Sequence, residues 1–310
     1  MKAKIVMHGG AINPTNEEFT EGLETSVKEG IKKINEGPLS AVEYAIKSGE
    51  NNPIFNAGTG SHLTLEGSVE MDASIMEGKT GNIGAVAAIK GVKNPISVAR
   101  NVMEETDHIL LVGEGAKRFA RISGFKEYDP MTKKRKNEWK EKIKKLEEGG
   151  EAEGWKKMSK WIDELDIKSD TVGAVAIDED GNIAAGTTSG GFPLKMPGRV
   201  GDSPILGCGT YAQDNTAAVS VTGNGEIVMK NFIAKSVVEE VGKGSSIQKA
   251  IEKVSKKVIE ENPDMVYGLI GIDKDGKVGC LRNNEELMPH TSTSTDLSDL
   301  KSNFGTVLTP

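Results

Sequence analysis

The sequence has few of the residues that build disulfides and metal centres. It holds two cysteines, Cys208 and Cys280, and four histidines among 310 residues. Two cysteines in a cytosolic chain are expected to be buried free thiols rather than a disulfide. The histidines stand singly at positions 8, 62, 108 and 290, without metal-ligand spacing to one another or to a cysteine. We therefore predict no metal chemistry.

An excess of positive charge is also missing. The chain carries 39 lysines and arginines against 46 aspartates and glutamates, which gives a formal net charge of -7. Nucleic-acid binding requires a clustered basic excess that neutralises phosphates. The one basic run, residues 133–136, is followed closely by glutamates and is interpreted as a solvated helix face. The sequence therefore predicts no nucleic-acid partner.

Long hydrophobic runs do not occur, and a membrane span needs about 18 continuous apolar residues. The apolar run near the N-terminus, residues 5–7, is too short for the core of a signal peptide. Hydrophobic residues still make up 36% of the chain, which is enough for a sizeable core. We expect a cytoplasmic protein with no membrane partner.

The signatures of several common enzyme classes are missing too. Neither a G-x-S-x-G elbow nor a Walker A loop is present. Residues 111–115 (LVGEG) place a G-x-G between a strand and a helix, but the third glycine and the later acidic residue of a dinucleotide loop are absent. We interpret this segment as a packing turn.

What the chain does contain is a regular series of strands and helices. Two Asp-x-Asp-Gly turns, at residues 178–181 and 273–276, each separate two strand-like runs. Hairpins accompanied by helices in each half predict antiparallel sheets covered by helical layers. Hydrophobic spacing predicts strands at 5–7, 69–75, 82–90, 109–112, 171–177, 182–188, 268–272 and 277–282, and helices at 18–35, 38–48, 95–104, 114–121, 231–241 and 246–260.

Residues 126–170 differ in character from the rest of the chain. They carry dense alternating charge and all three tryptophans. Trp139, Ile143 and Leu146 follow helical spacing, and a second apolar set at 155, 158, 162 and 165 does the same. We expect a helical linker that is partly docked. The tail that begins at His290 is low in complexity and is expected to be mobile.

Four motifs rich in glycine and hydroxyl groups lie between residues 170 and 226. They are residues 170–175 (DTVGAV), 186–191 (GTTSGG), 198–204 (GRVGDSP) and 222–226 (TGNGE). The first half adds residues 8–11 (HGGA), 52–58 (NPIFNAG) and 69–76 (VEMDASIM). In this order and spacing, the motifs resemble the plant-type asparaginase and isoaspartyl peptidase family of N-terminal-nucleophile hydrolases. The resemblance covers nearly the entire chain, apart from residues 126–170 and the tail after about residue 284.

The resemblance implies an α+β fold, a four-layer αββα sandwich of two antiparallel sheets in a single domain over residues 1–310. It also implies a precursor that cleaves itself between Asp170 and Thr171. The products are then an α subunit, residues 1–170 with the 126–170 linker, and a β subunit, residues 171–310, which stay together.

Thr171 has a chemical reason to become a chain end. A threonine hydroxyl is a weak nucleophile unless a base takes its proton, and no histidine lies nearby in the sequence. A free α-amine has a pKa of about 7.7 to 8.0 and is substantially neutral near pH 7 to 8, so an N-terminal threonine carries its own base. We therefore expect Thr171 to attack the Asp170 carbonyl, after which water opens the ester.

The family pattern assigns roles to the remaining motif residues. Ser189 matches a hydroxyl that orients the nucleophile, and Asn56 matches a residue near it. Thr222 and Gly223 match an oxyanion hole. The substrate's α-carboxylate and α-ammonium would bind a guanidinium and a carboxylate, which the pattern places at Arg199 and Asp202.

The resemblance further implies a structural sodium ion, and no other cofactor, held by backbone carbonyls. The matching loop residues are Glu50, Asn52, Phe55, Ala57 and Thr59. It also suggests a homodimer of cleaved protomers. One departure is Ile12, where the family usually has glycine; a bulky residue there is expected to slow or alter self-cleavage.

Several alternatives stay open at this point. Asp170 and Ser189 favour a glycosylasparaginase-like enzyme, whereas the missing secretion signal argues against one. A threonine-aspartase-like hydrolase is a further alternative. The last is an uncleaved, non-catalytic family member, which Ile12 leaves open. The main hypothesis is an amidohydrolase for asparagine and β-aspartyl (isoaspartyl) peptides.

Overall fold

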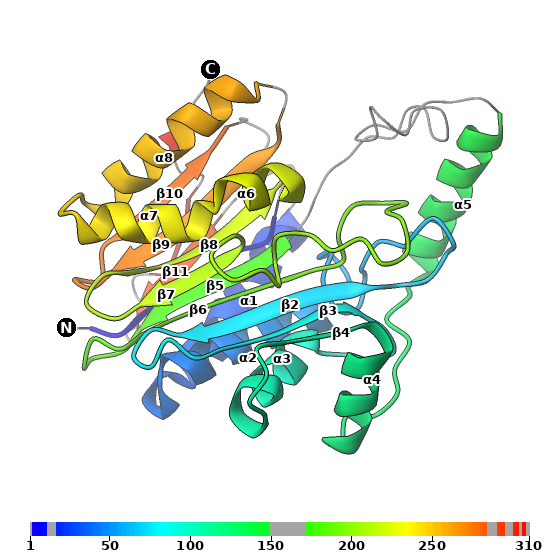
Figure 1. Ribbon diagram of the computed structural model, residues 1–310, viewed down its shortest axis with the longest axis horizontal. Helices are drawn as coiled ribbons and strands as arrows, with labels where there is room; N and C mark the ends of the chain where they lie inside the picture. The colour runs from blue at the N-terminus through cyan, green and yellow to red at the C-terminus, as the bar shows by residue number, and fades with distance from the viewer. Residues whose placement is uncertain are drawn as a thin grey trace.

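The computed structural model describes residues 2–10, 17–148, 171–263, 265–283, 290–294, 300–303 and 306–307. These residues form four layers, in which two stacked sheets lie between two layers of helices (Figure 1). The predicted α+β sandwich is confirmed.

The larger sheet has the strand order β12-β11-β1-β5-β6-β2-β3-β4. Its strands are β1 (Lys4–His8), β2 (Met71–Glu77), β3 (Ile83–Ile89), β4 (Leu110–Val112), β5 (Thr171–Ile177), β6 (Ile183–Ser189), β11 (His290–Ser294) and β12 (Lys301–Asn303). Neighbouring strands are antiparallel, with one exception at the edge, where β3 and β4 are parallel. A parallel pair needs a crossover connection, and helix α3 (Pro95–Glu105) supplies it.

The smaller sheet has the strand order β13-β10-β9-β8-β7. Its strands are β7 (Thr210–Gln213), β8 (Ala217–Gly223), β9 (Tyr267–Asp273), β10 (Val278–Arg282) and β13 (Thr306–Val307).

Both predicted hairpin turns are confirmed, one between β5 and β6 of the larger sheet and one between β9 and β10 of the smaller sheet. Oδ1 of Asp178 accepts hydrogen bonds from two backbone N–H groups beyond it, and Oδ1 of Asp273 does the same. Such Asx turns close a hairpin without needing a bound ion.

Helices cover the outer faces of both sheets. α1 (Glu17–Ile31), α2 (Pro38–Asn51), α3 and α4 (Gly113–Ile122) lie against the larger sheet, with a 3-10 turn at Ile34–Glu36 before α2. α7 (Ile233–Gly242) and α8 (Ile247–Glu261) lie against the smaller sheet, and the short α6 (Gly225–Asn231) precedes them. α2 begins where Gly37 takes a positive φ of 101° and Pro38 occupies the first helical turn.

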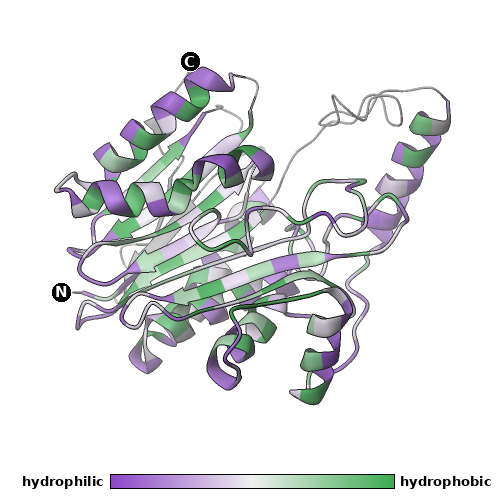
Figure 2. Ribbon diagram, viewed as in Figure 1, coloured by the Kyte–Doolittle hydropathy of each residue, from purple (hydrophilic) through white to green (hydrophobic). Residues whose placement is uncertain are grey.

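The central strands β5, β6, β8 and β9 are buried on both faces, which explains their near-continuous runs of small apolar residues. In β5, Val172 and Ala174 belong to the core beneath the helices, whereas Val175 and Ile177 belong to the core between the sheets. This alternation is the period-two pattern of a strand. Figure 2 shows hydrophobic residues along the strands and hydrophilic residues on the outer sides of the helices. Apolar surface is buried between the two sheets and between each sheet and its helices, and this burial stabilises the sandwich.

Helix α5 (Lys133–Glu147) extends from one end of the sandwich (Figure 1). It begins at Thr132, whose hydroxyl accepts a hydrogen bond from the Arg135 N–H. The Trp139 ring nitrogen donates to the Thr64 carbonyl at 3.0 Å, and Ile143 and Leu146 contribute to a small cluster around Leu194. The docked helix predicted for this part of the linker is confirmed. The second predicted helix, with its apolar set at 155–165, lies outside the described residues.

Two expectations differ from the structure. The tail was expected to be mobile, but residues His290–Ser294 form β11 and pair with β1 in register. Backbone hydrogen bonds to an otherwise open sheet edge explain the difference, because they do not depend on side-chain hydrophobicity. The second difference is that no strand was predicted within residues 210–223, which supply β7 and β8.

Cys208 is buried, as predicted, whereas Cys280, which was also predicted to be buried, is partly exposed. Among the described helices, none combines the length and the apolar character that a bilayer crossing requires.

Candidate active site

Thr171 and Ser189 face each other at the open end of the β5–β6 hairpin. They are register partners, and both are almost fully buried. The Thr171 hydroxyl donates a hydrogen bond to Ser189 Oγ at 3.2 Å. Ser189 Oγ also accepts from the backbone N–H of Gly191 at 3.0 Å. The hairpin therefore brings together the predicted nucleophile and the hydroxyl predicted to orient it.

Thr171 points into the space between the two sheets. A methyl group on Gly173 would overlap the Ser220 hydroxyl, so residue 173 on β5 faces residue 220 on β8. Val175 lies in the same inter-sheet cluster as Ala218, which shows that the two strands run past each other in opposite directions. With side chains alternating along both strands, Thr171 and Thr222 then lie at the same end of the inter-sheet space.

Thr222 carries a buried hydroxyl without a partner. Its Oγ1 is solvent-inaccessible and makes no hydrogen bond within the described part of the chain. Gly223 follows with a φ of 134°, and a Cβ there would overlap the Val266 carbonyl, so only glycine fits. An orphaned buried hydroxyl costs about 1–3 kcal/mol unless something satisfies it. A ligand atom that accepts or donates a hydrogen bond is the natural partner.

Asp202 has the same property. Its carboxylate is buried, and Oδ2 has no hydrogen-bond partner among the described residues. Burial is the main cause that raises the pKa of this carboxyl to about 7, partly offset by its own backbone N–H and by the Arg199 charge. A bound cation would favour the ionised form of this buried carboxyl. Asp202 is therefore a candidate binding group for a cation.

Arg199 is held by a carboxylate that the sequence analysis did not single out. Nε and Nη2 donate to the two oxygens of Glu226 at 2.9 and 2.8 Å, and the guanidinium lies over the Phe192 ring at 4.5 Å. Arg199 and Asp202, three residues apart, do not form an ion pair with each other in the described structure. Glu226 therefore fixes the orientation of the Arg199 guanidinium. The Asp202 carboxylate is not paired with Arg199 and can still bind another cation.

Gly225 marks the point where these charged groups converge. A Cβ at this position would lie 2.9 Å from Arg199 Nη2 and 2.9 Å from Asp202 Oδ1. The guanidinium and the carboxylate are thus close neighbours across the first residue of α6. Gly225 and Glu226 belong to the 222–226 motif, but no role was predicted for either residue from the sequence. A glycine and an acid at a helix start are too common to signal one.

Asn56 fixes the loop that follows Ser189. Its Nδ2 donates to the Gly191 carbonyl at 2.6 Å, and its backbone carbonyl accepts from Gly190 at 2.9 Å. Its Oδ1 accepts from the His62 N–H at 2.7 Å. The predicted proximity of Asn56 to the nucleophile is consistent with this geometry, although its contacts are with the loop and not with Thr171.

The predicted sodium loop folds tightly under this region. The Glu50 carbonyl accepts from the Thr59 N–H at 2.8 Å, and the Asn52 carbonyl accepts from Phe55 at 3.2 Å. Carbonyl oxygens of Glu50 and Phe55 lie against Gly58 and Gly60, where a side chain would overlap them. The backbone carbonyl oxygens of Glu50, Asn52 and Phe55 thus belong to one tight loop. Carbonyl oxygen is a ligand type that hard cations prefer.

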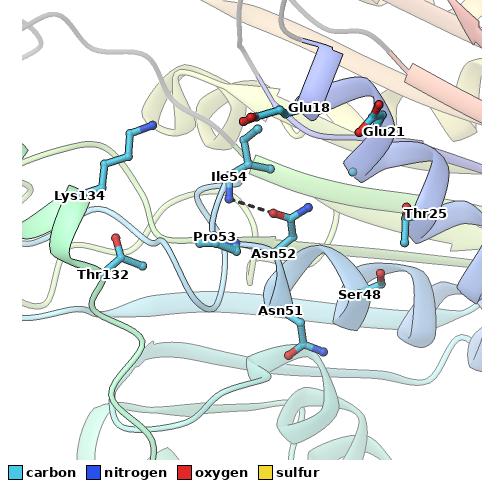
Figure 3. Close-up of a pocket in the computed structure, with 11 residues that line it drawn as sticks. Glu18, Glu21, Thr25, Ser48, Asn51, Asn52, Pro53, Ile54, Thr132 and Lys134 are labelled. Carbon is cyan, nitrogen blue, oxygen red and sulfur yellow. Dashed lines mark hydrogen bonds between the residues drawn. The ribbon is translucent and has the colours of Figure 1, made fainter.

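A surface pocket adjoins the predicted sodium loop, since Asn52 lines it (Figure 3). None of the predicted catalytic or substrate-binding residues lines it. It is bounded by α1, the end of α2, the loop after it and the start of α5, through Glu18, Glu21, Gly22, Thr25, Ser48, Asn51, Asn52, Pro53, Ile54, Thr132 and Lys134. Two predicted features of self-cleavage, Asp170 and Ile12, lie outside the described residues.

Comparison with known proteins shows which family this chain is similar to. A family model described as Asparaginase matches residues 1–301. The plant-type L-asparaginase of Pyrococcus furiosus is 50% identical over 289 residues, which cover 91% of this chain and 94% of the relative. The isoaspartyl peptidase/L-asparaginase of Danio rerio is 38% identical, over 88% of this chain and 86% of the relative. That of Rattus norvegicus is 40% identical, over 88% and 80%.

Proposed function

This chain belongs to the asparaginase family, and on that premise we propose that it is a self-activating amidohydrolase with Thr171 as its nucleophile. Its substrates are L-asparagine, which it converts to aspartate and ammonia, and β-aspartyl (isoaspartyl) peptides. The names of the archaeal and vertebrate relatives support both substrate classes.

The observation that carries this proposal is a pair of unsatisfied polar atoms. Thr222 Oγ1 and Asp202 Oδ2 are buried without a hydrogen-bond partner in the described structure, at the end of the sandwich where Thr171 lies. The α-ammonium of asparagine would satisfy Asp202, and a tetrahedral oxyanion would satisfy Thr222. Beside them, Arg199 has donors left for the α-carboxylate, because Glu226 engages only Nε and Nη2.

Activation proceeds by an acyl shift at residue 170. Thr171 Oγ1 attacks the Asp170 carbonyl carbon, the peptide C–N bond breaks, and an ester with a free α-amine forms. Water then hydrolyses the ester, leaving a carboxylate on residue 170 and an N-terminal Thr171. The proposed products are the α subunit, residues 1–170, and the β subunit, residues 171–310.

Catalysis repeats the same chemistry on the substrate. The Thr171 α-amine takes the hydroxyl proton, and Oγ1 attacks the side-chain amide carbon. Thr222 and the Gly223 N–H stabilise the oxyanion, and Ser189 keeps the nucleophile in its rotamer. The proton then passes to the leaving amine, and water opens the aspartyl ester.

We also propose three properties that rest mainly on the family. A structural sodium ion would bind the carbonyls of Glu50, Asn52, Phe55, Ala57 and Thr59, and the gathered carbonyls of the loop support it. The cleaved protomers would form a homodimer. The location would be cytoplasmic, for which the small number of cysteines, two in 310 residues, is the support.

The decisive experiment compares the wild type with Thr171→Ala and with a control, Thr106→Ala, whose hydroxyl binds only the end of α3 and the backbone of His108. Wild type and control should give two fragments on a denaturing gel and hydrolyse asparagine and β-Asp-Leu. Thr171→Ala should stay near 33 kDa and lose activity by at least about 10³-fold. Undiminished turnover by Thr171→Ala, or by uncut wild type, would refute the proposal.

The same assay ranks the alternatives. Ser189 is the one described feature that favours a glycosylasparaginase, because it stands where the family usually has threonine. Turnover of a glycosylated asparagine alone, with neither asparagine nor β-Asp-Leu accepted, would replace our substrate assignment by that one.

A further inference from the structure

Two acidic side chains of the larger sheet reach the loop that carries Arg199 and Asp202. Glu70 directly precedes β2, and Asp72 is its second residue. Because side chains alternate along a strand, residues 70 and 72 project from the same face. Both are nearly inaccessible to solvent, at 3% and 1% exposure. Buried carboxylates are rare unless they are hydrogen-bonded, so their partners define their role.

Each carboxylate accepts one backbone N–H of the substrate-binding loop. Glu70 Oε2 accepts from Gly198 at 2.7 Å, and Asp72 Oδ2 accepts from Gly201 at 3.0 Å. The two contacts fall on either side of Arg199. Residues 198–202 form no helix or strand, so they lack ladder hydrogen bonds of their own. The hydrogen bonds from Gly198 and Gly201 to the two carboxylates hold the loop backbone in place.

The second oxygen of each carboxylate binds the scaffold. Glu70 Oε1 pairs with Lys90 Nζ at 2.9 Å. Asp72 Oδ1 accepts from the Ala88 N–H at 2.8 Å, at a point where the β2–β3 register shifts and Ala88 has a positive φ of 47°. Each acid therefore bridges the sheet to the loop, with donors on both of its oxygens.

A buried ammonium group reinforces the same junction. Lys195 is fully buried, and its Nζ donates to the Glu70 carbonyl at 2.9 Å. Burial lowers the pKa of Lys195, and the charges of Asp72 and Glu70 act in the opposite direction. The two carboxylates thus lie close to two cations, Lys195 and Arg199, and they offset the positive charge beneath the loop.

We propose that Glu70 and Asp72 are positioning residues that fix the 198–202 loop and thereby set the affinity for substrates that carry both α-charges. This inference rests on the proposed function of Arg199 and Asp202. A carboxylate is required at both positions, since an amide has one acceptor oxygen and would turn its N–H₂ group toward one of the two donors that each carboxylate binds. Misplacing the loop by even about 1 Å would separate Arg199 from the α-carboxylate.

The test uses Glu70→Gln and Asp72→Asn in the full chain, with Glu77→Gln as the matched control. Glu77 lies at the far end of the same strand, and its carboxylate binds the Thr80 hydroxyl at the surface. We expect KM for asparagine to rise about tenfold in each test variant, with kcat within about twofold and self-cleavage at wild-type speed. The control should match the wild type in all three.

A second substrate separates positioning from general damage. Propanamide lacks both α-charges, so its turnover depends on neither Arg199 nor Asp202, and its kcat/KM should fall by less than about threefold. Equal losses for both substrates, or an unchanged KM for asparagine, would overturn the inference. If Asp72→Asn does not fold, Glu70→Gln decides alone. Failure of the wild type to hydrolyse asparagine or β-Asp-Leu would instead refute the proposed function.

Discussion

Arg199 is paired with Glu226, through two hydrogen bonds of 2.9 and 2.8 Å, and not with the nearer acid in sequence, Asp202. The bidentate pair fixes the plane of the guanidinium while leaving Nη1 unused. The side chain of Glu226 is half exposed, so part of the pair's strength is lost to solvent screening. Glu226 therefore acts as an orienting group for Arg199.

Replacing Glu226 by Gln should weaken asparagine binding. The amide keeps one acceptor oxygen and turns a donor toward the guanidinium, so we expect KM to rise about three- to tenfold with kcat nearly unchanged. Steady-state kinetics measure this. Glu239→Gln removes a comparable but distant ion pair with Lys235 and should behave as the wild type. An unchanged or lower KM in Glu226→Gln would contradict the orienting role.

Gly225→Ala should impair binding without impairing the fold. The new methyl would lie 2.9 Å from both Arg199 Nη2 and Asp202 Oδ1, so these groups must move apart. We expect kcat/KM for asparagine to fall at least about tenfold, with a melting temperature within about 3 °C of the wild type. Gly242→Ala, whose methyl meets nothing closer than 3.8 Å, is the control. Equal kinetics for the two variants would show that the pair is not rigid.

Ser189 should tolerate threonine but not alanine. Its Oγ accepts from both Thr171 and Gly191, and alanine leaves two buried donors unsatisfied. At about 1–3 kcal/mol, this loss corresponds to roughly a 10- to 100-fold lower kcat. Threonine keeps the oxygen and adds χ1 stiffness, so its kcat should equal or exceed that of the wild type. Equal rates for the alanine and serine enzymes would remove Ser189 from the mechanism.

Asparagine binding should weaken as the pH falls through neutrality. The pKa of Asp202 is raised to about 7, mainly by burial, and only its ionised form attracts an α-ammonium. Protonation of Asp202 alone should therefore lower kcat/KM for asparagine by up to tenfold per pH unit below pH 7.

The Thr171 α-amine titrates in the same direction, so a reference substrate is needed. Succinamate lacks the α-ammonium but requires the same nucleophile. The ratio of the two kcat/KM values, asparagine over succinamate, should decline below pH 7, because only the numerator depends on ionised Asp202. A ratio that is flat from pH 5 to 9 would argue against Asp202 as the ammonium site.

Gly84 should be intolerant of any side chain. It lies on β3 where α3 crosses most closely, and a Cβ would overlap the Ala99 carbonyl of that helix. Because backbone cannot yield as a side chain can, we expect Gly84→Ala to lower the free energy of unfolding by about 1–3 kcal/mol. Gly115→Ala, in α4 with open space around it, should be neutral or stabilising by up to about 1 kcal/mol. Denaturant unfolding compares the two, and equal stabilities would contradict the close approach.

The spacing of apolar residues and the turn motifs were sufficient to predict most of the helices and two of the hairpin turns. The helices over residues 17–31, 38–51 and 247–261 show apolar residues at helical spacing, and both Asp-x-Asp-Gly turns were recognisable from chemistry alone. β8 was missed because its residues 217–223 (AAVSVTG) are small and lie in a stretch rich in turn formers. Their strand conformation depends on pairing with β7 and β9, which no local window contains.

The sequence by itself determined the kinds of chemistry available and their order along the chain, because motif composition and periodicity are properties of near neighbours. The resemblance of its motifs to the asparaginase family implied a threonine nucleophile at residue 171, with its hydroxyl partner, guanidinium and carboxylate. Only the tertiary structure decided that Thr171 lies opposite Ser189, that Arg199 pairs with Glu226, and that Asp202 Oδ2 has no hydrogen-bond partner among the described residues. These outcomes depend on strand register and sheet stacking, which bring together residues tens of positions apart.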